Sequence, residues 1–187
     1  MLRILILILF ATGFISCAPP QKKLLTESST YEYDIETRLE ELGIQLDRPG
    51  APVANYVNVV RTGNLLFLAG KGPRNGAGEY IAGKVGRELS VEEGYAAARQ
   101  VGITQLGVLQ EILGDLNRVV RIVKVTGMVN AAEDFTQHPE VINGFSDLMV
   151  EVFGERGKHA RAAVGMASLP RNMACEIEMV VEVTPTP

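Results

Sequence analysis

The sequence contains no tryptophan and only two cysteines and two histidines among its 187 residues, and aromatic side chains make up 6% of it. Cys17 and Cys175 cannot supply a disulfide framework, and the two histidines have no partners at the spacing of metal ligands, so no metal site is expected. The core should therefore be mainly aliphatic. Lys and Arg total 18 against 22 Asp and Glu, a net charge of −4. This balance argues against nucleic acid as the partner.

The first 16 residues have the pattern of a secretory signal peptide. Arg3 precedes an apolar run over residues 4–10, which is too short to cross a bilayer. Phe14-Ile15-Ser16-Cys17 resembles the lipid-attachment motif of bacterial lipoproteins. We therefore expect residues 1–16 to be removed and Cys17 to carry a lipid. A plain secretory signal is the alternative.

The segment after Cys17 has the composition of a tether, because residues 17–34 are rich in Pro, Lys, Ser and Thr. Ala18 gives no acidic retention signal, so we expect the anchor to lie in the outer membrane, on its periplasmic side, if the host is Gram-negative. A lipid would hold a folded domain at the membrane without a transmembrane helix.

The folded domain is expected to span residues 35–187, with an N-terminal helix over 35–43 and a core over 54–184. Asp34 can cap that helix and Gly43 can end it. Because the helix is short and amphipathic, we expect it to pack on the outside of the main domain.

The core shows an order of strand, strand, helix, strand, helix, strand, strand. Residues 65–70 are apolar on both faces, which predicts a strand covered on both sides. Ser90 and Glu93 form a capping box before the longest helix. This order predicts an α+β fold, a single sheet with two helices on one face, and oligomerisation to cover the other. The strands are expected at 56–61, 65–70, 118–130, 159–169 and 174–183, and the helices at 90–113 and 139–153.

The segment Lys71–Arg87 is rich in glycine but matches no complete phosphate-binding motif. Gly78 to Lys84 fits the P-loop spacing, yet Val85 stands where the motif needs Ser or Thr, and no helix follows. We interpret it as a mobile surface loop that could rim a pocket.

The last two strands predict a hairpin around residues 170–173. Arg161 lies among small residues in the first strand, which leaves space for a small carboxylate. The second strand alternates, with Cys175 on its apolar face as a core residue. If Leu169 pairs with Ala174, Arg161 faces Glu182. The alternative role for Arg161 is a salt bridge, either to Glu182 across the hairpin or to a neighbouring subunit.

Several segments resemble the Rid family, also called YjgF and long labelled endoribonuclease L-PSP. The block Ala160-Arg161, Leu169-Pro170 and Glu176-Ile177-Glu178 carries the most specific part of this resemblance, which runs from about Tyr56 to Val183. The other matching segments are Ala54–Val57, Gly63–Gly70, Gly114–Val120, Val129-Asn130 and Val141–Gly144.

The resemblance implies a chorismate-mutase-like homotrimer with three clefts between subunits. It implies that Arg161 binds the carboxylate of a small 2-imino acid and that Glu176 positions the water that hydrolyses it to a 2-keto acid and ammonia. Tyr56, Gly70 and Asn143 match further substrate-binding positions. No metal or cofactor is implied. The alternatives are ordinary roles, with Glu176 a solvated strand residue and the others packing or surface residues.

The assumed hairpin register supports a site shared between chains. It separates Arg161 from Glu176 by roughly 20 Å along the hairpin at about 3.3 Å per residue, so one chain could hardly join them. Ala69 and Ala163 depart from the hydroxyl and thiol residues common in active members. A non-catalytic trimer that binds or senses a small carboxylate on the cell envelope is therefore the alternative to the enzyme. A nuclease, the third reading, disagrees with the acidic charge.

Overall fold

The computed structural model describes residues 31–46, 50 and 54–185. The expected signal, Cys17 and most of the tether lie outside these residues. The element order agrees with the prediction, with boundaries that differ by a few residues at most. Short 3-10 turns cover Leu116–Arg118, Gly154–Gly157 and Pro170–Asn172. The helices and strands are α1 (Ile35–Glu41), β1 (Val59–Thr62), β2 (Leu65–Lys71), α2 (Val91–Leu113), β3 (Val119–Asn130), α3 (His138–Phe153), β4 (Ala160–Met166) and β5 (Cys175–Val183).

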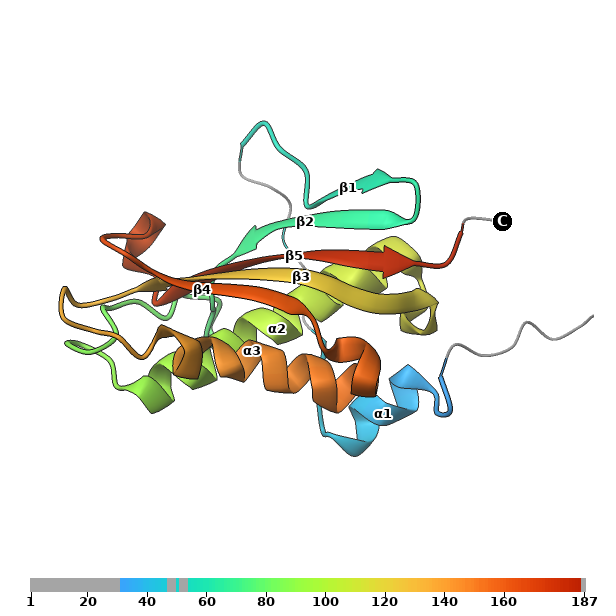
Figure 1. Ribbon diagram of the computed structural model, residues 1–187, viewed down its shortest axis with the longest axis horizontal. Helices are drawn as coiled ribbons and strands as arrows, with labels where there is room; N and C mark the ends of the chain where they lie inside the picture. Colours follow the sequence, from blue (N-terminus) through green and yellow to red (C-terminus); the bar gives the residue numbers. More distant parts are fainter. Residues whose placement is uncertain (1–30, 47–49, 51–53, 186–187) are drawn as a thin grey trace, which may run out of the picture.

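The five strands form one sheet in the order β1-β2-β5-β3-β4, and α2 and α3 cover one of its faces (Figure 1). β3 and β4 are parallel, and the other neighbouring strands are antiparallel. The unit β3-α3-β4 is thus a parallel crossover, which needs a connection of about a dozen residues or more and finds it in α3. The predicted α+β fold, with one sheet and two helices on one face, is confirmed.

The predicted hairpin of the last two strands is wrong, because β3 lies between β4 and β5. Val125 on β3 pairs with Arg161 on one side and with Met179 on the other. Glu182 instead pairs with Leu65 and with residue 121. Arg161 and Glu182 therefore do not face each other, and no ion pair joins them in the described part of the chain.

The core lies between the sheet and the two long helices. The predicted alternation of β5 is confirmed, since every second residue from Cys175 to Val183 is buried on the helix side. Glycine residues allow α2 and α3 to approach each other closely. A Cβ on Gly144 would lie 2.0 Å from the backbone oxygen of Tyr95, and one on Gly102 would lie 2.6 Å from Leu148. Their packing therefore depends on the absence of these side chains.

The second face of the sheet is open among the described residues, so the predicted cover of residues 65–70 on both sides is present on one side only within this part of the chain. Leu66 and Leu68 are buried beneath the helices, but Phe67 between them is 44% exposed and Val60 beside it is 55% exposed. An apolar strand face that no described element of the chain covers is a candidate interface with another chain.

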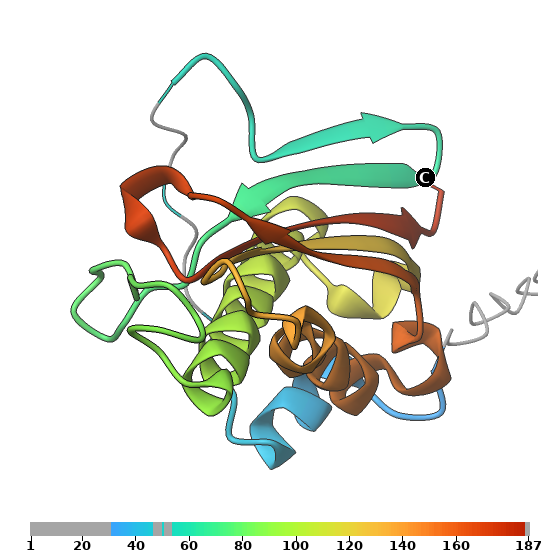
Figure 2. The same ribbon diagram turned by 60° about the vertical axis from the view of Figure 1, so that its left-hand side comes forward.

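The N-terminal helix packs outside the main domain, as predicted, on the side of α3 away from the sheet (Figure 2). The Asp34 carboxylate caps it by accepting from the Thr37 backbone N–H at 2.9 Å. Tyr33 donates its hydroxyl to the Val152 carbonyl at 3.1 Å, and Arg38 donates to the Glu151 carbonyl at 3.0 Å. Among the described residues, no helix combines the length and apolar character needed to cross a membrane.

The second half of the glycine-rich segment is anchored to the domain rather than lying loose on the surface. Val85 is fully buried, and its backbone bridges Leu89 and Ala131. The Lys84 ammonium donates to Asn130 Oδ1 at 3.2 Å and to the Ala131 carbonyl at 3.1 Å. The first half, from Lys71 to Ile81, lines a cavity. This agrees with the prediction that the segment could rim a pocket.

Candidate functional site

Arg161 is held by α3 at the edge of the sheet. Its Nη1 donates to Asn143 Oδ1 at 2.9 Å and to Ser146 Oγ at 3.0 Å. Asn143 and Ser146 are three residues apart and so share one face of the helix. No described carboxylate pairs with the guanidinium, and its Nε and Nη2 bond to no described atom. The structure thus brings together Arg161 and Asn143, two of the residues that the resemblance named, and no described carboxylate neutralises the guanidinium charge.

His159 extends this support behind Arg161. Its Nδ1 lies 2.6 Å from the Gly157 carbonyl oxygen and its Nε2 lies 3.1 Å from Ser146 Oγ. Because a carbonyl only accepts, we assign the proton to Nδ1, so Ser146 donates its hydroxyl to Nε2 and accepts from Arg161. Burial lowers the pKa of His159, the bond to Gly157 opposes this, and the Arg161 charge lowers it further. A neutral His159 therefore fixes the hydroxyl that holds Arg161.

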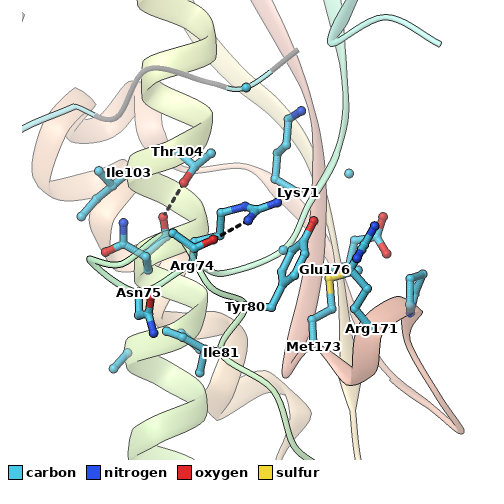
Figure 3. A pocket seen from close by; sticks show the side chains of 18 of the residues that line it. Lys71, Arg74, Asn75, Tyr80, Ile81, Ile103, Thr104, Arg171, Met173 and Glu176 are labelled. Carbon is cyan, nitrogen blue, oxygen red and sulfur yellow. Dashed lines mark hydrogen bonds between the residues drawn. The ribbon is translucent and has the colours of Figure 1, made fainter. Parts of the chain in front are cut away.

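Glu176 lies in a second region, a cavity of about 1150 Å³ (Figure 3). Tyr56 and Gly70 also line this cavity. Its carboxylate occupies the space where a side chain at position 70 would stand, since a Cβ on Gly70 would lie 2.3 Å from Glu176 Oε1. Burial raises the pKa of Glu176, and the neighbouring Glu178 raises it further. The structure thus brings together Tyr56, Gly70 and Glu176, three of the residues that the resemblance named.

An irregularity in the sheet distinguishes Glu176 from the other glutamates of β5. The register of β2 against β5 shifts between Leu68 and Lys71, so that Leu68 pairs with Met179 and Lys71 with Ile177. Such irregularities often redirect a side chain beside a functional site. This one brings the backbone of Gly70 against Glu176. Glu176 and Glu182 are both half-buried and Glu178 is exposed, so the contact with Gly70, not burial alone, distinguishes Glu176.

The two regions do not form one site within the chain. Arg161 aligns with Val125 of β3, and Glu176 aligns with Met128. Three residues along the sheet and two strand spacings across it separate their backbones by roughly 14 Å, less than the wrong hairpin register indicated. Arg161 bonds to α3 on the helix side, whereas Glu176 alternates with the buried Ile177 and so belongs to the opposite face.

Sequence reasoning missed several residues of both regions. Ser146 had one available signal, its spacing of three residues from Asn143 on the helix. In the cavity, Arg74 lies with its guanidinium carbon 4.0 Å from the centre of the Tyr80 ring, and Arg171 lies 5.7 Å from it. No sequence pattern predicts that these residues are neighbours, because the loop that carries Arg74 and Tyr80 meets the turn that carries Arg171 only after the chain folds.

Metal or thiol chemistry finds no support in the described residues. No three His, Cys, Asp or Glu side chains among them cluster as metal ligands would. Cys175 is fully buried, and burial, with the nearby Glu176 charge, raises its pKa to about 12. A thiol with so high a pKa is not a nucleophile at neutral pH. The prediction that Cys175 is a core residue is confirmed.

Comparison with known proteins agrees with this fold. A family model described as "YjgF/chorismate mutase-like, putative endoribonuclease" matches residues 36–183. Protein TCP17 of Trypanosoma cruzi is 44% identical over 149 residues, which cover 79% of this chain and 93% of that protein. The crystal structure of Atu1372 from Agrobacterium tumefaciens, titled as of unknown function, is 41% identical with a TM-score of 0.74, covering 80% of this chain and 94% of that one.

A second solved structure, described as "a putative endoribonuclease", comes from Shewanella oneidensis. It is 30% identical with a TM-score of 0.78, and the match covers 81% of this chain and all of that one. The family match spans α1 and all five strands, and so includes both regions around Arg161 and Glu176. The chain therefore belongs to the YjgF/chorismate mutase-like family.

Proposed function

We propose that this protein hydrolyses small 2-imino acids to 2-keto acids and ammonia, in clefts between the subunits of a homotrimer. The observation that carries the proposal is the state of Arg161. Two neutral oxygens hold one of its nitrogens, while no described carboxylate neutralises it. A guanidinium that is held in position and keeps unbonded N–H groups can bind a substrate carboxylate through two parallel hydrogen bonds.

Glu176 supplies the acid–base group in this proposal. Water adds to the imine carbon, and Glu176 accepts the proton that the water loses. Glu176 passes this proton to the imine nitrogen, which gives a carbinolamine. It then transfers the proton of the carbinolamine hydroxyl to the same nitrogen, so that the C–N bond breaks and leaves the keto acid and ammonia. A carboxyl group whose pKa is raised by burial can both accept and return a proton at moderate pH. Arg161 contributes by fixing the carbon in reach of the water.

The trimer brings the two regions together. Arg161 lies on β4, an edge strand of the sheet, and can therefore meet a neighbouring chain. The exposed apolar face that includes Val60 and Phe67 offers a surface for that contact. In each cleft, one subunit supplies Arg161 and Asn143. The other subunit supplies Glu176, with Tyr56 and Gly70 lining the cavity around it.

A non-catalytic module that binds small carboxylates is the second candidate. The observation in its favour is Ala69, which precedes Gly70 and offers no hydroxyl to the cavity. The Ala69 carbonyl instead accepts from Gln105 Nε2 at 3.0 Å, a contact that holds β2 to α2. Saturable binding that Arg161→Ala abolishes, without turnover, would identify this module.

The test of the enzyme couples the purified domain to an amino-acid oxidase that generates a 2-imino acid. We expect keto-acid and ammonia release to exceed the rate without the protein, and Arg161→Ala to remove the excess. Arg87→Ala is the matched control, because Arg87 lies outside both regions and pairs with Glu88 at 2.7 Å on the surface. A rate unaffected by the wild-type protein would refute the activity.

We also propose that Cys17 carries a lipid and that the protein lies on the periplasmic side of an outer membrane. The motif around Cys17 and the tether-like composition after it support this. Labelling cells with a fatty acid tests it. The wild type should incorporate the label and Cys17→Ala should not, and an unlabelled wild type would contradict the anchor.

A further inference from the structure

The cavity beside Glu176 is cationic although the chain as a whole is acidic. Lys71, Arg74 and Arg171 line it, whereas the formal net charge of the protein is −4. In the described part of the chain none of the three forms an ion pair. Of the two acidic lining residues, Glu93 is engaged in the cap of α2 and Glu176 is the candidate acid–base group. Excess positive charge in a hollow attracts an anion.

Tyr80 holds two of these cations in place. Its ring lies 4.0 Å from the Arg74 guanidinium carbon and 5.7 Å from that of Arg171, with Tyr80 between the two (Figure 3). A backbone bridge between Arg74 and Tyr80 fixes their pairing in the loop. Stacking on a ring leaves the N–H groups at the edge of a guanidinium available. Arg74 Nη1 donates to the Gly78 carbonyl, and the remaining N–H groups of Arg74 can still bind an oxyanion.

The position of Arg171 is set by its backbone. Arg171 has a φ of 55° and Asn172 a φ of 56°, both in the left-handed region that non-glycine residues rarely adopt. The turn is held by Asn130 Nδ2, which donates to Asn172 Oδ1 at 2.9 Å, and by the Gly83 N–H, which donates to the Asn172 carbonyl at 2.8 Å. These contacts place Arg171 against the loop that carries Tyr80.

Lys71 completes the group. Its ammonium donates to Asn58 Oδ1 at 2.6 Å, a neutral partner. Burial lowers the pKa of Lys71, and the charge of Arg74 lowers it further. A bound anion would offset both effects, because it would neutralise the repulsion between the two cations.

We propose that the cleft takes a doubly anionic substrate, whose second anionic group binds to Lys71, Arg74 and Arg171 around Tyr80. This inference rests on the proposed function, in which Arg161 of the neighbouring subunit binds the first carboxylate. The substrate is then the imine of a 2-keto acid with a distal carboxylate or phosphate. A small dianion fits better than nucleic acid, because three cations around one cavity in an acidic protein do not form an extended basic surface.

Binding of keto acids, the product class, tests the inference by titration calorimetry. The probes are 2-oxobutanoate with one carboxylate, 2-oxoglutarate with two, and 3-phosphohydroxypyruvate with a carboxylate and a phosphate. We expect at least one dianion to bind about tenfold or more tightly than 2-oxobutanoate, since one charged hydrogen bond is worth that much. The tighter of the two dianions identifies the distal group.

The variant that removes the proposed distal site combines Arg74→Gln with Arg171→Gly, because glycine accepts the φ of 55° at position 171. It should lose the preference for dianions and keep its affinity for 2-oxobutanoate, which also shows that it folds. Arg74→Gln alone should lose part of the preference, and Arg87→Ala should lose none of it.

Three results would overturn the inference. They are equal binding of all three probes, a preference that survives in the double variant, and binding of a single-stranded RNA, tighter than that of any probe, that the double variant loses. Failure of the proposed function is separate. It would appear as 2-oxobutanoate binding that survives in Arg161→Ala.

Discussion

Replacing Gly70 by alanine should disable the site while leaving the fold intact. The backbone at Gly70 does not have a positive φ, so alanine is compatible with its conformation. The added methyl group, however, would lie 2.3 Å from Glu176 Oε1 and 3.0 Å from its Cδ and Cγ. Ordinary contacts are about 3.5 Å or longer. The Glu176 carboxylate must therefore shift by about 1 Å or more.

A displacement of that size in a group that handles the proton costs about 100-fold in turnover. The effect on stability should be small, below about 1 kcal/mol, because Glu176 is a half-buried side chain that can rotate towards the cavity. We therefore expect a large loss of kcat with little change in the urea midpoint.

The coupled oxidase assay measures this loss, and Gly76→Ala is the matched control. Gly76 lines the same cavity, has no positive φ, and an added Cβ there meets nothing within 4 Å. In a Glu176→Ala background, Gly70→Ala should cause no further loss, because its target has been removed. Activity within twofold of wild type in Gly70→Ala, with Glu176→Ala inactive, would refute this account of the two residues.

Three further predictions follow from the two regions and the core. The acid limb of the kcat/KM profile should fall with a midpoint above the ordinary carboxyl pKa of 4.5, because burial raises the pKa of Glu176 and activity needs its ionised form; a limb at or below 4.5 contradicts this. Ser146→Ala, which removes one support of Arg161, should raise KM by about three- to tenfold, and an unchanged KM would show that Asn143 suffices. Gly144→Ala should lower the free energy of unfolding by about 3 kcal/mol, measured with urea, because its Cβ would lie 2.0 Å from a backbone oxygen of α2; a loss below about 1 kcal/mol would contradict this packing.

The sequence was sufficient for the elements and their layers because local signals determine them. The capping box of Ser90 and Glu93 forms as predicted, with both of its bonds present. The strand order was not predicted, because periodicity identifies a strand without identifying its neighbours. A signal for the parallel pair did exist. Two strands joined by the 16-residue helix α3 make a βαβ unit, which leaves β4 beside β3 rather than beside β5.

The site was predictable to the extent that the resemblance named its positions. Tyr56, Gly70 and Glu176 gather in one region and Arg161 with Asn143 in the other. The sequence does not show which contacts hold these residues in place. The close approach of Gly70 to Glu176 depends on the register shift between β2 and β5, and the contact of Arg74 with Tyr80 depends on how their loop folds back.

The measurement that tests the central claim most directly mixes two inactive variants, Arg161→Ala and Glu176→Gln. Each keeps one region intact, so a cleft shared between subunits regains both when the two chains meet in one trimer. After the variants are refolded together in equal amounts, random assembly should restore about one quarter of wild-type activity, since each cleft draws one region from each neighbour. A mixture that stays as inactive as its components would contradict the shared cleft.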